Sequence, residues 1–225
     1  MRLRTMVLLA ASLPWISLLA AEPPVPFPAD PQQPLERTCF QTGQAYSDLA
    51  NLRSDVAIVY GIDARLPEHI QSWRDRGYRI HVMTGVAWGQ YQDYLYGRFD
   101  GVNHEDEAQT DRNGSPHRHG NSRDVFYMCP GTNYGKFLCV GVQRALDAGT
   151  EAIHLEEPEF WVQDGYEGGF KREWHSYYGE DWQPPHSSVD AQWRASKLKY
   201  VLYRRALQQV FDHVQDYNRR TGRRV

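Results

Sequence analysis

The chain has 225 residues, of which 41% are hydrophobic and 24% are charged. This is the composition of a globular protein, and it excludes a wholly disordered, collagen-like or coiled-coil chain. The net charge of −3 argues against nucleic acid as a partner. The length is enough for one large domain or for part of an α/β barrel.

The N-terminal segment has the pattern of an export signal. Two arginines precede an apolar run over residues 6–21 that ends in small residues. We therefore expect residues 1–21 to be a signal peptide, which predicts a secreted or periplasmic protein with no membrane attachment after cleavage. An uncleaved anchor is the alternative, although a membrane span needs about 20 apolar residues. Six prolines within residues 22–34 predict an extended linker ahead of a domain over residues 35–225.

Four short runs of β-branched and apolar residues indicate buried strands, at residues 55–60, 78–83, 125–128 and 152–155. Apolar residues at helical spacing, with proline near the start or glycine at the end, indicate helices over residues 67–73, 134–148, 170–177 and 189–217. Ser188 is the expected N-cap of the last helix. The polar segment over residues 89–124 is longer than an ordinary connection, and such segments are often functional lids.

Strands that alternate with helices predict a parallel sheet of the α/β class. Residues 223–225 are expected to begin a fifth strand, and four βα units are half of an eight-fold barrel. We therefore expect a partial (β/α)8 TIM barrel that is truncated, with a small open sheet as the alternative. In either case Asp63, Thr84, Cys129 and Glu157 should lie at one rim, because each follows an expected strand.

The strongest candidate for chemistry follows the fourth expected strand, in the run Glu156-Glu157-Pro158-Glu159-Phe160-Trp161. The carboxyl ends of the strands form the catalytic face of a barrel. A carboxyl group beside aromatic side chains is partly desolvated, and this favours the protonated form that a general acid needs. We expect Glu157 to be catalytic, with Glu156, Glu159 and Trp161 in contact with the substrate.

Other strand ends supply further candidates for substrate contact, namely Asp63, Trp88, Asn133 and Tyr134. The seven Trp and fourteen Tyr of the chain favour a carbohydrate ligand, because aromatic faces stack on sugar rings. Trp88 is equally well interpreted as a sugar platform or as a cover for the core.

Metal and redox chemistry are not indicated. The three cysteines, Cys39, Cys129 and Cys139, lack the C-x-x-C spacing of zinc and redox motifs. One disulfide is possible in an exported protein, and we expect Cys129 and Cys139 to be buried apolar residues. Histidines and acidic residues within residues 104–119 have no regular ligand spacing, so we expect neither a metal nor a cofactor.

Four stretches carry a resemblance to a known family: Met83-Thr-Gly-Val-Ala-Trp88, Ala152-Ile-His-Leu-Glu-Glu-Pro-Glu-Phe-Trp161, Tyr177-Tyr-Gly-Glu180 and Arg194-Ala-Ser-Lys-Leu-Lys-Tyr200. Over residues 56–220 the chain resembles the N-terminal half of secreted bacterial glycoside-hydrolase-like barrel proteins. Glu156-Glu157-Pro158 is also similar to the Asn-Glu-Pro that ends strand four in retaining β-glycosidase barrels. This resemblance implies that Glu157 is the general acid/base, and Glu156 stands where those barrels have the Asn that binds the sugar 2-hydroxyl.

In those barrels the nucleophile is a Glu at the end of strand seven, for which a four-strand chain has no counterpart. We therefore expect half of an active site. The function favoured is glycoside hydrolysis on a carbohydrate substrate, and the alternatives are a non-catalytic carbohydrate-binding barrel and a barrel lyase or transferase.

Overall fold

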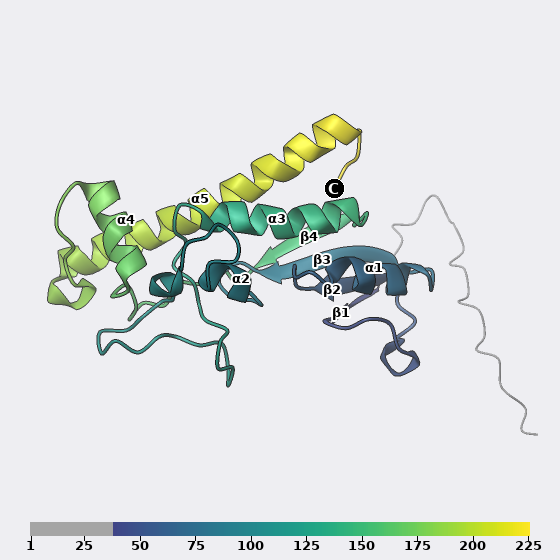
Figure 1. Ribbon diagram of the computed structural model, residues 1–225, viewed down its shortest axis with the longest axis horizontal. Helices are drawn as coiled ribbons and strands as arrows, with labels where there is room; N and C mark the ends of the chain where they lie inside the picture. Colours follow the sequence, from purple (N-terminus) through teal and green to yellow (C-terminus); the bar gives the residue numbers. More distant parts are fainter. Residues whose placement is uncertain (1–37) are drawn as a thin grey trace, which may run out of the picture. The chain divides into compact units, whose positions relative to one another are not determined.

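The computed structural model describes residues 38–225, so the expected signal peptide and linker lie outside the described residues. The strands are β1 (Cys39–Thr42), β2 (Val56–Tyr60), β3 (Arg79–Gly85) and β4 (Ala152–Glu156). The helices are α1 (Leu66–Arg74), α2 (Gln92–Leu95), α3 (Tyr134–Asp147), α4 (Gly168–Tyr178) and α5 (Val189–Thr221). Figure 1 shows their arrangement.

The four strands form one parallel sheet in the order β1-β2-β3-β4. This confirms the α/β class and the parallel sheet in sequential order. The expected strand over residues 125–128 is wrong, because this segment pairs within the long loop instead. Met128 forms an isolated antiparallel bridge with Ala108, and Phe126 forms one with Arg118. The sheet instead includes β1 (Cys39–Thr42), a strand that the sequence pattern did not indicate.

One face of the sheet packs against α1 and α3 and forms the main core. The strand residues of this face are Ala57, Val59, Ile80 and Val82, and all are buried. Helix α1 contributes Ile70 and Trp73, which are fully buried, and α3 contributes a buried stripe at helical spacing. Helix α3 also packs lengthwise on α5, and the two run side by side in Figure 1.

Helix α5 extends over 33 residues. Ser188 is its N-cap, as expected, with its side chain accepting a hydrogen bond from the backbone N–H of Ala191 at 3.0 Å. The helix ends at Gly222, whose φ of 72° is the left-handed conformation that glycine adopts readily. The strand expected over residues 223–225 is wrong, because Arg223 donates to the carbonyls of Leu146 and Thr150 and the segment stays irregular.

A second apolar cluster joins α4 to the first half of α5. Its buried members are Cys129, Phe170, Trp174, Ala195, Leu198 and Leu202. Cys129 is fully buried, as expected, and Cys139 is partly buried. All three cysteines of the chain are free, and Cys39 is exposed.

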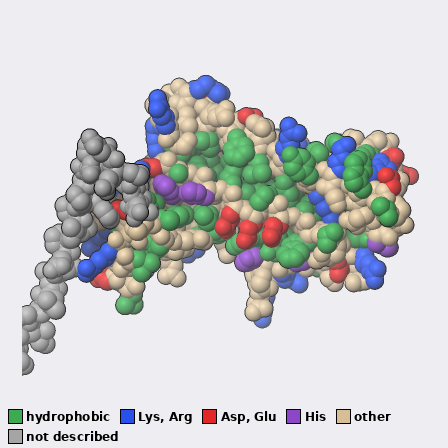
Figure 2. Space-filling view, turned by 180° about the vertical axis from the view of Figure 1, so that it is seen from behind, with side chains coloured by type: hydrophobic (Ala, Val, Ile, Leu, Met, Phe, Trp, Pro, Cys, Tyr) green, Lys and Arg blue, Asp and Glu red, His purple; other side chains and the backbone are tan. Residues whose placement is uncertain are grey.

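Side chains alternate between the two faces of a strand, so a second set points away from the helices. We call this the open face; it carries Tyr60, His81, Met83, His154 and Glu156. All five residues are half-buried. Figure 2 shows a face of the molecule on which histidine and acidic side chains are exposed among apolar ones. Within residues 38–225, no helix is long and apolar enough to cross a lipid bilayer.

Candidate active site

The backbone of Glu157 is unusual. This residue directly follows β4 and has a φ of 49°, in the left-handed region that non-glycine residues rarely occupy. Two hydrogen bonds hold it there, because its carbonyl accepts from the N–H of Ala87 at 3.2 Å and from that of Glu159 at 2.7 Å. The preceding carbonyl, that of Glu156, accepts from Val86 at 2.7 Å. Such backbone strain costs about 1–3 kcal/mol and is concentrated at functional sites.

The Glu157 side chain is held by a residue of the neighbouring turn. Trp88, just beyond β3, donates its indole N–H to Glu157 Oε2 at 2.5 Å. The indole ring lies in a stack, with His119 at a centroid distance of 3.5 Å and Tyr60 at 5.8 Å. Glu157 is exposed, so the carboxyl group that is fixed in this way remains open to a ligand.

A second group of aromatic rings continues this stack. His117 stacks on Trp161 at a centroid distance of 4.5 Å, and Tyr127 packs edge-on against both. Tyr127 also lies beside His119 at 5.9 Å, which joins the two groups. The rings come from β2, the turn after β3, the long loop and the turn after β4, so the carboxyl edge of the sheet carries one aromatic array.

Two tyrosines are electrostatically coupled to the acidic run. Burial raises the pKa of Tyr127, and the nearby carboxylates of Glu159 and Glu157 raise it further. Burial likewise raises the pKa of Tyr60, together with the carboxylate of Glu156. Both phenols therefore stay protonated at neutral pH, and each can donate a hydrogen bond to a ligand or to a carboxylate.

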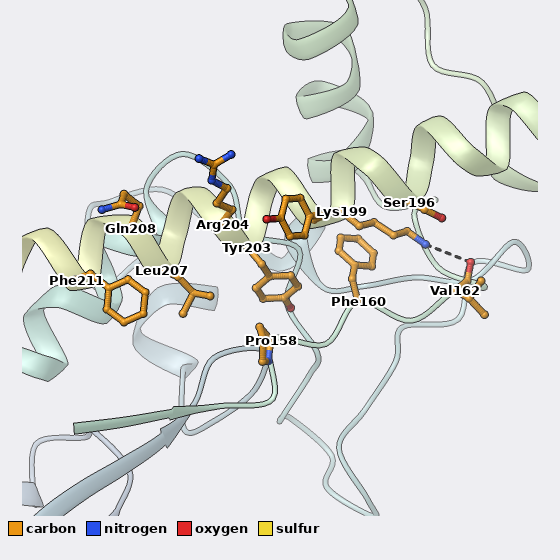
Figure 3. A pocket seen from close by; sticks show the side chains of 11 residues that line it. Pro158, Phe160, Val162, Ser196, Lys199, Tyr203, Arg204, Leu207, Gln208 and Phe211 are labelled. Carbon is orange, nitrogen blue, oxygen red and sulfur yellow. Dashed lines mark hydrogen bonds between the residues drawn. The ribbon is translucent and has the colours of Figure 1, made fainter. Parts of the chain in front are cut away.

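The expected aromatic surroundings of Glu157 are only partly present. Trp161 is exposed beside His117, but Phe160 points to the other side of the turn, where it packs on Phe170 and Tyr203. There it lines an apolar pocket of about 470 Å³ against α5 (Figure 3). The desolvation of Glu157 by Phe160 that we expected is therefore wrong, and the aromatic side chain that contacts Glu157 is that of Trp88.

Several of the expected substrate residues lie elsewhere. Asp63 follows β2 at the same sheet edge as Glu157, but its carboxylate accepts from the N–H of Arg65 at 2.8 Å and organises the start of α1. Thr84 and Tyr134 are buried in the main core, where the Tyr134 hydroxyl donates to the Val86 carbonyl.

Asn133 donates to Asp100 at 2.9 Å and lines a separate polar pocket of about 460 Å³. Cys129 lies in the second apolar cluster rather than at a strand end.

Four residues of the site were not predicted from the sequence, namely Tyr60, His117, His119 and Tyr127. Three of them belong to the long loop or its continuation, and the only available signal was the unusual length of that segment. Within residues 38–225, no cluster of three or more His, Cys, Asp or Glu side chains is arranged to hold a metal ion.

Buried charges support the loop from behind. Asp164 is fully buried and accepts from His117 Nδ1 at 2.9 Å, which fixes the histidine that stacks on Trp161. Lys199 on α5 donates to the carbonyls of Trp161 at 2.8 Å and Val162 at 3.2 Å, and burial lowers its pKa to about 8. Burial raises the pKa of Glu167 to about 7. The loop segments that carry the aromatic array are thus held from behind by buried ionisable side chains.

No protein-family model matches this chain, and no curated protein matches it.

Proposed function

We propose that the site hydrolyses glycosidic bonds, with Glu157 as the general acid/base. The observation that carries the proposal is the exposed Glu157 carboxylate, held by Trp88 in a left-handed backbone conformation at the carboxyl edge of a parallel sheet. Barrel enzymes place their catalytic groups at this edge. A general acid at this position protonates the departing glycosidic oxygen and so lowers the barrier to bond cleavage.

The aromatic array supports a carbohydrate as the substrate. Trp161 lies exposed just beyond the acidic run, edge-on to Tyr127, and exposed aromatic rings of this kind bind the apolar faces of sugar rings. Glu156 and Glu159, on either side of Glu157 and Pro158, supply hydrogen-bond acceptors for sugar hydroxyl groups.

We further propose that the sheet belongs to a (β/α)8 barrel. The sequential parallel order β1-β2-β3-β4 supports this, because a doubly wound sheet reverses its strand order at a switch point. Helices α1 and α3 pack on one face of the sheet, as the outer helices of a barrel do.

One observation favours a non-catalytic carbohydrate-binding site as the second candidate. Glycosidases generally use two carboxyl groups that flank the bond to be cleaved. Glu156 ends β4 and Glu157 and Glu159 follow directly, so the three carboxyl groups come from one short segment, whereas the aromatic array is built from several elements.

The experiment that tests hydrolysis uses a panel of aryl glycosides with good and poor leaving groups. Glu157→Gln should lower kcat by about 10²–10⁴-fold on substrates with poor leaving groups, and much less on activated ones. The matched control is Glu68→Gln, which removes an exposed carboxylate of α1 and should leave kcat unchanged. Turnover that is unaffected by Glu157→Gln would overturn the role of Glu157. Sugar binding without turnover would support the non-catalytic candidate.

A further inference from the structure

The open face carries a pair of histidines that the proposed hydrolysis does not use. His81 on β3 and His154 on β4 are diagonal neighbours, since the residue paired with His154 is Met83. Their nearest nitrogens, Nδ1 of His81 and Nε2 of His154, are 3.1 Å apart. The two rings are tilted by 36°, with centroids 5.2 Å apart. Adjacent strands thus bring two imidazole nitrogens together on the open face of the sheet.

This separation is close to the one that a shared metal ion imposes. An imidazole nitrogen lies about 2.0–2.1 Å from a first-row ion such as Zn²⁺, so two of them in tetrahedral geometry are about 3.3 Å apart. In this structure the two nitrogens are within hydrogen-bond distance of each other, so an ion bound between the rings would replace that hydrogen bond. Both rings are half-buried.

A third donor of a different chemical kind lies beside the pair. Met83 is two residues beyond His81 on the same face of β3, and it is paired directly with His154 on β4. Side chains of directly paired residues on neighbouring strands start about 5 Å apart, so the Met83 thioether can reach an ion held by the two histidines. Thioether sulfur is a soft ligand that selects Cu⁺, and imidazole suits copper as well.

We propose that His81, Met83 and His154 form a copper-binding site on the open face of the sheet. The ligand set contains no carboxylate or carbonyl oxygen, so it is unsuited to Mg²⁺ or Ca²⁺. It is also independent of the proposed hydrolysis, because Glu157 lies beyond the end of β4 and is bonded to Trp88.

The test titrates the purified chain with Cu⁺ under a reducing atmosphere, and separately with Cu²⁺ and Zn²⁺, against a chromophoric chelator. One equivalent of Cu⁺ should bind. His81→Asn and His154→Asn should each lower the Cu⁺ affinity by more than about 100-fold. Loss of a residue that only hydrogen-bonds to a metal ligand costs roughly 10–100-fold, and loss of a ligand itself should cost more. Met83→Leu conserves volume and should weaken Cu⁺ while leaving Zn²⁺ affinity unchanged. X-ray absorption of the Cu⁺ complex should show a sulfur ligand that disappears in Met83→Leu.

Three controls make the result decisive. His175→Asn removes an exposed histidine of α4 and should leave copper binding unchanged. Glu157→Gln should also bind copper normally, which separates this proposal from hydrolysis. Circular dichroism checks that each variant is folded. Copper binding that survives the double His81→Asn/His154→Asn change, or is lost in the double His117→Asn/His119→Asn variant alone, would overturn the site. Equal Cu⁺ affinity in Met83→Leu would overturn the assignment to copper.

Discussion

The indole N–H of Trp88 donates to the carboxylate of Glu157 at 2.5 Å, and this bond joins the turn after β3 to the turn after β4. The same two turns are joined through the backbone, where Val86 and Ala87 donate to the carbonyls of Glu156 and Glu157. The backbone hydrogen bonds fix the position of the Glu157 main chain, and the indole hydrogen bond fixes the orientation of its carboxylate. Mutation can therefore change the orientation of the Glu157 carboxylate without changing the position of its main chain.

Trp88→Phe tests the orientation. The phenyl ring retains a face for His119, but the N–H that holds Glu157 is lost. Because Glu157 is exposed, we expect a stability loss below about 1 kcal/mol in urea unfolding. If hydrolysis takes place, kcat should fall about tenfold as the carboxylate loses its position. Trp193→Phe, an exposed indole on α5, is the control and should change neither quantity. A large stability loss in Trp88→Phe with unchanged turnover would mean that Trp88 only covers the core.

Glu157→Gly tests the backbone strain. Glycine adopts a φ of 49° without steric cost, so this variant should be more stable than the wild type by about 1 kcal/mol, although it loses the carboxylate. Urea unfolding midpoints measure the change. In contrast, Glu159→Gly places glycine where φ is not positive and should reduce stability by up to about 1 kcal/mol. If both variants were destabilised equally, the strain at Glu157 would be refuted.

Glu167 predicts how stability depends on pH. Its folded pKa of about 7 exceeds the ordinary value of 4.5, because burial disfavours the carboxylate. Between these values the folded state holds a proton that the unfolded state has released, so stability should fall as pH rises from about 4.5 to 7. The contribution is at most about 3.5 kcal/mol, given that each unit of pKa corresponds to about 1.4 kcal/mol.

Chemical unfolding of the wild type and of Glu167→Gln across this pH range checks that dependence. The variant should show a flatter profile, because its amide does not titrate. Glu159→Gln, at an exposed position, should retain the wild-type slope. A Glu167→Gln profile parallel to that of the wild type would contradict the assignment.

The cysteines should differ in reactivity toward a thiol reagent. Cys39 is exposed, whereas burial raises the pKa of Cys139 to about 11 and also raises that of Cys129. Because the thiolate is the reactive form, one thiol should react quickly in the native protein and three after unfolding. Cys39→Ser should abolish the fast phase. Rapid labelling of two thiols in the native state would show that the region around Cys139 opens readily.

The sequence predicted those elements whose pattern is local. Val56–Tyr60 is a β-branched run, Pro67 and Gly77 bound α1, and Ser188 caps α5, so these elements were found close to their observed positions. Residues 125–128 have the same apolar character as a strand, but hydrogen bonds to Ala87 and His117 hold them in the long loop. Local composition cannot identify these partners, because Ala87 is distant in the sequence and His117 lies in an irregular segment without a strand pattern.

In the candidate site, too, some residues could be predicted from local sequence patterns and others could not. Glu157 and Trp88 were found because each follows a strand, and strand ends can be located from local patterns. His117 and His119 reach the site only through the path of the long loop, which is fixed by contacts such as that between His117 and Asp164. Phe160 was misplaced for a related reason, since the left-handed turn at Glu157 redirects the chain and cannot be foreseen from a glutamate.

The long connection between β3 and β4 also bears on how the sheet assembles. Strands β2 and β3 are separated only by α1, so their pairing closes a short loop. Pairing of β4 must first bring together the two ends of residues 86–151, and the entropic cost of closing a loop grows with its length. Contacts between residues far apart in sequence slow folding. The edge of β3 that receives β4, and the turn that holds Glu157, should therefore be completed last.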